Sequence, residues 1–182
     1  MLELSLHILD IAENSTRANA SLVEITIVED TRKNVFSFEI RDNGVGMDRD
    51  TIDRAMDPFY TTKKVRRVGL GLPMLAQACE RANGRFEIRS APGEGTRVYA
   101  LFGHSHIDRQ PLGDIAGVIS MLILGNPDRD FLYTHVFNGG TYTLDTRELR
   151  QELGDVPLNH IEVVNLIRDN INEGIEELKA PS

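Results

Sequence analysis

The sequence is poor in several features that would mark particular classes of protein. Among 182 residues it has one cysteine, Cys79, so an intramolecular disulfide cannot form. It has no tryptophan, and only 6% of its residues are aromatic. Its longest strongly apolar stretch, residues 115–124, is far shorter than the roughly 20 residues that span a bilayer. We therefore expect neither a disulfide-stapled scaffold nor a membrane-spanning protein.

An excess of positive charge is also missing. The chain has 20 Lys+Arg against 28 Asp+Glu, a net charge of -8 and a pI near 5.1. Such a chain is a poor partner for nucleic acid or an anionic membrane, and we expect it to bind neither. The first ten residues, MLELSLHILD, have no basic region ahead of an apolar core, so we expect no secretory signal and a cytoplasmic location. With 41% hydrophobic and 26% charged residues, the composition is that of a globular protein.

The first 103 residues alternate between helical and strand patterns. Apolar residues recur at helical spacing over 2–16 and 72–82, and Asp48 is placed to cap a short helix that runs to residue 55. Gly84 stands where a helix C-cap is expected. Alternating or β-branched segments predict four strands, at 22–30, 35–42, 85–90 and 97–102. This order predicts an α+β sandwich.

The composition shifts from residue 104 onward. We expect an apolar helix at 112–124, a hairpin of 131–137 and 141–146 that turns at 138–140, and helices at 146–153 and 158–179. Six Lys+Arg stand against 13 Asp+Glu here, a balance of -7. The sequence thus divides into a first domain, 1–103, and a small α/β domain, 104–182, for which we expect a regulatory or partner-binding role.

Three local patterns in the first domain carry potential chemistry. Glu3, His7, Asp10 and Asn14 fall on one polar stripe of the first predicted helix. The turn DNGVGM, residues 42–47, follows a strand, and the glycine pair of VGLGLP, residues 68–73, opens a helix. Each pattern alone is compatible with ordinary loop or helix-end geometry. Their ordered combination is much more specific.

This combination resembles the ATPase superfamily of sensor histidine kinases, type II topoisomerases such as DNA gyrase B, heat-shock chaperones and mismatch-repair proteins (GHKL). DIAENSTRANAS is similar to the N box, DNGVGM to the first glycine box, DPFYTTK to the F box and VGLGLP to the second glycine box. ANGRFEIRSAPGEGTRVYALF is similar to the closing hairpin of a histidine-kinase catalytic domain. The resemblance implies a Bergerat-type α/β sandwich over residues 1–103.

The resemblance also implies two cofactors, ATP and Mg²⁺, and roles for individual residues. Asn14 matches the amide oxygen that coordinates Mg²⁺, with Arg17 near the phosphates. Asp42 matches the carboxylate that accepts a hydrogen bond from the adenine amine, and Thr96 a threonine of the adenine pocket. The remaining box residues are expected to approach the nucleotide through their backbone or side chains: Gly44, Gly46, Met47, Phe59, Lys63, Gly69, Leu70, Gly71 and Leu72.

A short basic segment separates the F box from the second glycine box. It carries Lys63, Lys64, Arg66 and Arg67, whose charges are placed to screen a triphosphate. A solvated basic loop is the competing interpretation.

Three features depart from the family pattern. Asp10 stands where hydrolysing members have a glutamate, so we assign it as the catalytic base but expect slow hydrolysis. Few residues precede the N box, so residues 104–182 or a second subunit must cover a sheet edge. The segment around His106 is similar to a phosphoacceptor box, but Ile107 replaces the usual acidic residue, and a linker is the better interpretation.

Two functions follow from the resemblance. The first is an ATP-dependent protein kinase of the histidine type, or weak ATPase, that transfers the γ-phosphoryl group to a protein in signalling. The alternative is an ATP-gated binding protein or anti-sigma-type switch with slow or no transfer. Both imply a protein partner or phosphoacceptor, and a homodimer is compatible with either.

Overall fold

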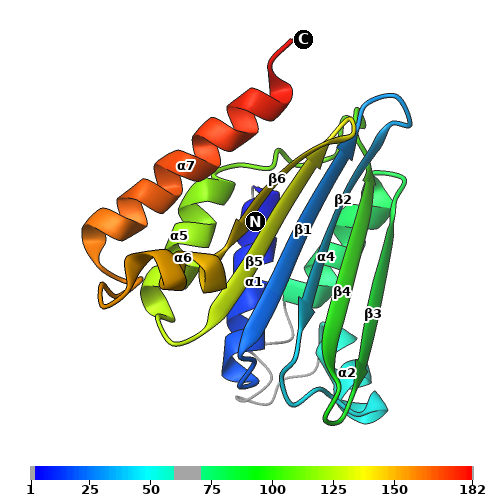
Figure 1. Cartoon of the computed structure of the whole chain (residues 1–182). Coiled ribbons are helices and arrows are strands. Elements are labelled where there is room, and N and C mark those ends of the chain that lie inside the picture. The colour runs from blue at the N-terminus through cyan, green and yellow to red at the C-terminus, as the bar shows by residue number, and fades with distance from the viewer. Residues whose placement is uncertain (1–2, 60–70, 182) are drawn as a thin grey trace.

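A computed structural model describes residues 3–59 and 71–181 of the chain. Six strands form one sheet in the order β3-β4-β2-β1-β5-β6, and the helices pack mainly against one of its faces (Figure 1). The α+β prediction is therefore confirmed. The strands are β1 (Leu22–Asp30), β2 (Val35–Asp42), β3 (Arg85–Ala91), β4 (Gly95–Gly103), β5 (Asp130–Phe137) and β6 (Gly140–Asp145). The helices are α1 (Leu4–Arg17), α2 (Arg49–Met56), α4 (Gly71–Arg81), α5 (Ile115–Gly125), α6 (Thr146–Leu153) and α7 (Ile161–Lys179).

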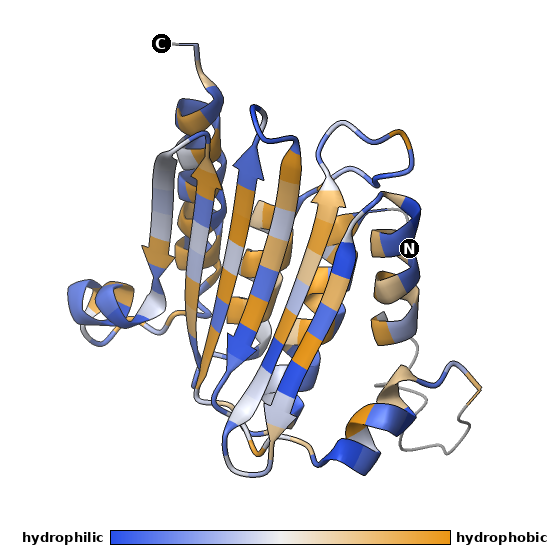
Figure 2. Ribbon diagram, turned by 90° about the vertical axis from the view of Figure 1, so that its right-hand side faces the viewer, coloured by the Kyte–Doolittle hydropathy of each residue, from blue (hydrophilic) through white to orange (hydrophobic). Residues whose placement is uncertain are grey.

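The two faces of the sheet differ because the strands alternate. Along β1 every second residue is buried, beginning at Val23, on the face of the sheet where α1 packs against β1, α4 against β3 and β4, and α5 against β5. Within residues 3–59 and 71–181 the opposite face carries no helix, and Figure 2 shows it toward the viewer. The core between sheet and helices is built from aliphatic and phenylalanine side chains, among them Leu4, Ile8, Ile25, Ile27, Phe36, Phe38, Leu75, Phe102, Ile119 and Phe131. Of the helices in the described part of the chain, none combines the length and apolarity needed to cross a bilayer.

Residues 104–182 continue the sheet of residues 1–103. Strand β5 pairs in parallel with β1 over eight residue pairs, from Leu22 opposite Asp130 to Glu29 opposite Phe137. Helix α5 packs on α1, and one hydrophobic core contains residues from both segments. The boundary expected after residue 103 thus lies inside a single sheet and a single core. We expected residues 104–182 or a second subunit to cover a sheet edge of the first 103 residues, and β5 covers the edge at β1.

The ends of the elements follow local chemistry. The side chain of Asp48 accepts a hydrogen bond from the amide of Thr51 and caps α2, as predicted. The end of α4 differs from the prediction, because the left-handed residue is Asn83 (φ 56°) rather than Gly84. Gly84 is required for a different reason, since a Cβ there would lie 1.6 Å from the carbonyl oxygen of Leu101.

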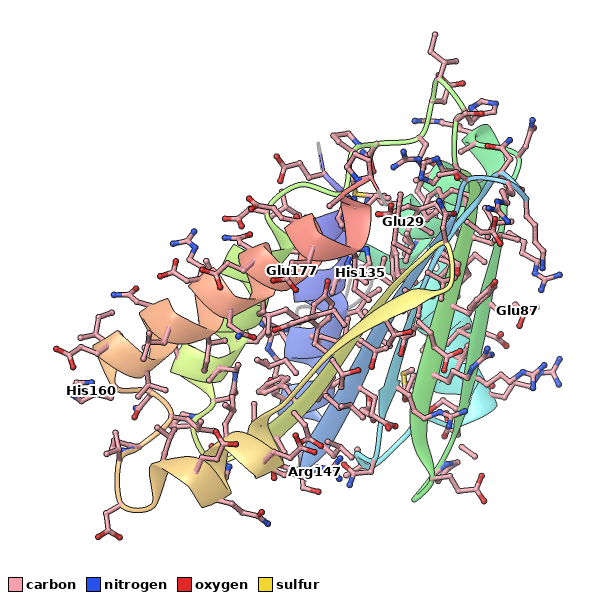
Figure 3. The ribbon with its side chains drawn as sticks, turned by 45° about the horizontal axis from the view of Figure 1, so that its top comes forward. Glu29, Glu87, His135, Arg147, His160 and Glu177 are labelled. Atoms are coloured by element: carbon pink, nitrogen blue, oxygen red, sulfur yellow. The ribbon has the colours of Figure 1, made fainter. Side chains whose placement is uncertain are left out.

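A buried polar cluster joins the two segments at the end of β1. Glu29 is 4% exposed, and its Oε1 lies 3.2 Å from Lys179 Nζ of α7 and 3.4 Å from His135 Nε2 of β5 (Figure 3). His104 Nε2 lies 3.7 Å from Oε2 of the same carboxylate. Burial would raise the pKa of Glu29, but its contact with His135 and the charge of Lys179 outweigh that effect and lower this pKa from 4.5 to about 2.

We expect Glu29→Gln to reduce the free energy of unfolding by about 2 kcal/mol at pH 7, because it removes the buried partner of two basic groups. The pKa of Glu29 is lower in the folded state, so its contribution is complete above pH 4.5 and decreases as the pH falls toward 2. Urea unfolding of both proteins between pH 7 and 3 measures the difference. A difference that grows toward low pH would contradict this assignment.

Candidate functional site

A cavity of about 290 Å³ opens beside the C-terminal half of α1. Its walls are largely apolar, with Ile11, Ile40 and Val98 among the lining residues. Its polar side chains come from segments far apart in the sequence, and they are Asn14, Ser15, Arg17, Asp42, Thr51 and Thr96. The volume lies at the lower end of the range for small-molecule sites, and an apolar pocket with few convergent polar groups is their usual chemistry.

Asp42, at the end of β2, is the most constrained polar residue of this cavity. Its Oδ2 accepts a hydrogen bond of 2.6 Å from the Ser15 hydroxyl. Its Oδ1 accepts hydrogen bonds from the amides of Gly44 (2.9 Å) and Thr96 (3.2 Å). Three donors from three segments thus fix a carboxylate that is 9% exposed and lines the cavity. A carboxylate has about four acceptor positions, so capacity for a further donor remains.

Close backbone packing explains the glycines of the turn after Asp42. Gly46 has φ +72°, and a Cβ there would lie 2.0 Å from the carbonyl oxygen of Ala91. A Cβ on Gly44 would lie 2.7 Å from the carbonyl oxygen of Ala18, at the end of α1. The Val45 amide donates a 2.9 Å hydrogen bond to that same oxygen. The turn is therefore fastened between α1 and the β3–β4 hairpin, and glycine is needed at both positions.

Helix α1 contributes an amide and a guanidinium to the wall. Arg17 Nη1 donates a hydrogen bond of 3.0 Å to Asn14 Oδ1, and Arg17 Nη2 lies 3.6 Å from Glu13 Oε2. Both Asn14 and Arg17 line the cavity. Asn14 thus presents a neutral oxygen and Arg17 a positive charge on the same side of the site, a combination that suits a metal-bound anion.

Asp10 lies against the start of α4. A Cβ on Gly71 would lie 1.8 Å from Asp10 Oδ2, so only glycine permits this approach of carboxylate and backbone. Burial and, to a smaller extent, the charge of Glu13 raise the pKa of Asp10, and Arg17 opposes them. A raised pKa makes the Asp10 carboxylate a better proton acceptor, which fits the role of a base, whereas the positive N-terminal end of a helix acts in the opposite direction.

The structure brings together many of the residues predicted for the site. Seven of them line the cavity: Asn14, Arg17, Asp42, Gly46, Met47, Leu72 and Thr96. Gly44 lies against Ala18 and Asp42, two residues of the lining, and Asp10 and Gly71 meet at the start of α4. Phe59 is 86% exposed and does not line the cavity. Lys63, Gly69 and Leu70 lie outside the described residues.

His7 shares the polar stripe of α1 with Asp10 and Asn14 but does not line the cavity, whereas two serines that were not predicted support it. His7 is buried away from the cavity, with Nε2 3.2 Å from Gln110 Oε1, and burial lowers its pKa. Two serines were missed by sequence reasoning. Ser15 holds Asp42, and Ser90 Oγ accepts a 2.8 Å hydrogen bond from the Met47 amide. Ser15 follows Ile8, Ile11 and Ala12 on the buried side of α1, which was the available signal.

Comparison with known proteins assigns this arrangement to a family. The family model of histidine kinase-, DNA gyrase B- and HSP90-like ATPases matches residues 2–105, which include the whole cavity. The chain belongs to this ATPase family. Members of the family bind ATP, and the resemblance inferred from the four boxes is confirmed.

Individual relatives of this ATPase include sensor kinases. The chain is 38% identical over 68 residues to the sensor histidine kinase YxdK of Bacillus subtilis, covering 35% of this chain and 21% of YxdK. It is 32% identical over 91 residues to the sensor protein kinase WalK of Staphylococcus haemolyticus, covering 47% of this chain and 15% of WalK. The chain therefore spans about a fifth or less of the length of these curated relatives.

A solved structure shares the fold of this ATPase. The MutL ATPase domain of Aquifex aeolicus, solved with ADP, superposes with a TM-score of 0.51 at 15% identity, covering 91% of this chain and 70% of the MutL domain. This match extends over most of the chain, beyond the residues that the family model matches.

We expect Ser15→Ala to weaken ATP binding about 10-fold, because a hydrogen bond to a charged group contributes about 1.5 to 3 kcal/mol and its loss frees Asp42 to rotate. Titration calorimetry measures the effect. Ser5→Ala is the matched control, since Ser5 is equally buried on α1 but lies outside the cavity lining, and its effect should be below about 2-fold. Equal ATP affinities of the two variants would count against the role of Ser15.

Proposed function

We propose that this ATPase binds Mg-ATP in the cavity beside α1 and transfers the γ-phosphoryl group to a protein in signalling. The observation that carries the proposal is Asp42, a carboxylate held by three donors in an apolar cavity. A fixed hydrogen-bond acceptor in an apolar cavity suits a flat apolar ring with an amine at its edge. Adenine is such a ring. The similarity to sensor kinases supports phosphoryl transfer as the reaction.

The residues around Asp42 have separate tasks in this proposal. Met47 and Leu72 line the cavity and would exclude water from a bound base, while Thr96 holds Asp42 in place through its amide. Asn14 supplies the oxygen ligand for Mg²⁺, and Arg17 neutralises phosphate charge. When bound, Mg²⁺ orients the phosphate oxygens and stabilises the charge that develops during transfer. The α4 N-terminus, which begins at Gly71, adds backbone donors for the phosphates.

His106 is the candidate phosphoacceptor within this chain, and its position relative to the cavity bears on whether the acceptor belongs to another molecule. Thr96, in the cavity wall, is the second residue of β4, and Gly103, three residues before His106, is its last residue. Seven steps along a strand at about 3.3 Å each separate them by about 23 Å. His106 thus follows the end of β4 that lies far from Thr96 in the cavity wall, and we propose that a partner protein supplies the phosphoacceptor.

The experiment is incubation of the purified chain with γ-labelled ATP, Mg²⁺ and the products of genes adjacent to its own. Acid-labile, base-stable label on one of those proteins, absent when Asn14→Ala replaces the wild type, is the expected result. If the chain binds ATP but none of these proteins becomes labelled, phosphoryl transfer is contradicted.

An ATP-gated binding protein is the second candidate, and Asp10 favours it. Its side chain is one methylene shorter than the glutamate of hydrolysing relatives, and correct placement of an attacking group depends on fractions of an ångström. In this case ATP alters the affinity for a protein partner without transfer of phosphate. Partner affinity that is the same with and without ATP would count against this candidate.

A further inference from the structure

The two edges of the sheet differ in charge. Strand β3, at one edge, alternates arginine and glutamate at Arg85, Glu87 and Arg89, and charged side chains protect an edge from pairing with another chain. Strand β6, at the other edge, has the sequence GTYTLD, with no charge before its last residue. Figure 2 shows the contrast as a β6 that is pale up to its orange arrowhead and a β3 of alternating blue and orange. By this criterion β6 is the unprotected edge.

The backbone hydrogen bonds of β5 alternate between its two neighbours. The amides of Asp130 and Asn138 donate to the carbonyl oxygens of Ser21 and Glu29, at 2.8 and 2.9 Å. Both donors have even numbers, and alternate residues of a strand bond to the same side. The even-numbered residues of β5 therefore bond to β1, and the odd-numbered residues bond to β6.

The register then shows which groups of β6 remain unpaired. Gly140, Tyr142 and Leu144 lie opposite odd-numbered residues of β5 and bond to them. Thr141 and Thr143 lie opposite even-numbered residues, so their amides and carbonyls point away from the sheet. Both threonines are exposed, and no other segment of residues 3–59 and 71–181 accepts a hydrogen bond from their amides.

Helix α7 lies beside this edge and gives it a negative charge. The Tyr142 hydroxyl donates a hydrogen bond to Asn170 Oδ1, which fixes the side of α7 that adjoins β6. Residues at helical spacings from Asn170 share that side and are exposed. They are Leu166, Asn170, Glu173 and Glu177. Figure 3 labels Glu177 on α7, near His135 of β5 and well apart from Glu87 of β3.

We propose that β6 binds an extended, basic segment of a partner protein as an additional strand. The outward amides and carbonyls of Thr141 and Thr143 provide main-chain hydrogen bonds, Leu166 (68% exposed) an apolar contact, and Glu173 and Glu177 the preference for positive charge. A second copy of this chain fits poorly, because pairing β6 with β6 would place two acidic α7 helices on the same face. This inference is independent of the nucleotide chemistry, so it can fail or succeed separately from the proposed function.

The test uses the full chain and three nine-residue peptides in fluorescence anisotropy. One alternates valine with lysine, one alternates valine with glutamate, and one is the lysine peptide with its valine amides methylated. We expect the lysine peptide to bind at least 10-fold more tightly than either of the others. Binding of the methylated peptide with unchanged affinity would overturn strand addition without any change to the protein.

Variants of the protein locate the site. Thr143→Pro removes one outward amide but no bond to β5, and it should weaken binding of the lysine peptide at least 10-fold, whereas Thr143→Val keeps the amide and should change it less than 2-fold. Glu173→Lys with Glu177→Lys should also weaken it at least 10-fold. The matched control is Glu80→Lys with Glu94→Lys, which makes the same change in net charge elsewhere and should alter the affinity less than 3-fold.

Equal binding of the lysine peptide to wild type and to a folded Thr143→Pro variant would overturn the proposal. So would equal effects of the two charge-reversal pairs, because they would show attraction by net charge alone. A dimer in sedimentation that dissociates in Thr143→Pro would assign the edge to a second copy and also overturn it.

Discussion

Asp42→Asn should reduce the affinity for ATP about 30- to 100-fold. The substitution keeps the size of the side chain but replaces one carboxylate oxygen by an NH₂ group, which cannot accept. In the position of Oδ2 the NH₂ group would face the Ser15 hydroxyl, and in the position of Oδ1 it would face the amides of Gly44 and Thr96, all of which donate to the carboxylate. Loss of a hydrogen bond to a charged acceptor costs about 1.5 to 3 kcal/mol, and an opposed donor adds to this cost. Titration calorimetry with ATP measures the change.

The control for this prediction is Asp48→Asn. Asp48 is an exposed aspartate at the N-cap of α2, outside the cavity lining, and asparagine caps helices equally well. Its ATP affinity should stay within about 2-fold of the wild type. If Asp42→Asn binds ATP as tightly as Asp48→Asn does, the base is not recognised by Asp42.

Removal of residues 104–182 should abolish cooperative folding of the remainder. The truncated chain would lose the parallel pairing of β5 with β1 and expose Leu4 and Ile8, which are 0% exposed in the intact protein and lie on the helix that α5 covers. Each fully buried aliphatic side chain contributes about 1.5 to 3 kcal/mol, and a domain has only about 5 to 15 kcal/mol in total.

Circular dichroism during heating distinguishes the outcomes. We expect the intact chain to unfold in one sharp transition, and residues 1–103 to show no transition or to aggregate. A fragment 1–103 that unfolds cooperatively within about 5 °C of the intact chain would show that it is an autonomous domain, as the change in composition after residue 103 first indicated.

Local periodicity was sufficient to predict the helices and strands, because each has its own pattern of apolar residues. The turn after Asp42 was predicted from its glycines, but its attachment to Ala18 was not, since nothing in the sequence pairs residue 45 with residue 18. The parallel pairing of β5 with β1 was missed for the same reason: it joins residues more than 100 positions apart. Glu29 was overlooked although it continues the buried alternation of Val23, Ile25 and Ile27. That alternation was the one sequence signal for its burial.

The sequence predicted residues that line the candidate site, but not the residues that hold them in position. The N box and the first glycine box located Asn14 and Asp42, and the family resemblance located Thr96; the structure brings all three to one cavity. The hydrogen bond from Ser15 that fixes Asp42 depends on how α1 packs over β2, which spacing alone does not reveal. Phe59 was expected at the nucleotide because of its box, yet its side chain is exposed.

Selection of adenine by Asp42 is the central claim, and a comparison of ATP with GTP by titration calorimetry in the presence of Mg²⁺ tests it most directly. Adenine presents an amine to the carboxylate, whereas guanine presents a carbonyl oxygen at the same position, so two acceptors would face each other. We expect ATP to bind about 100-fold or more tightly than GTP. Equal affinity for the two nucleotides, or no binding of ATP, would contradict the account.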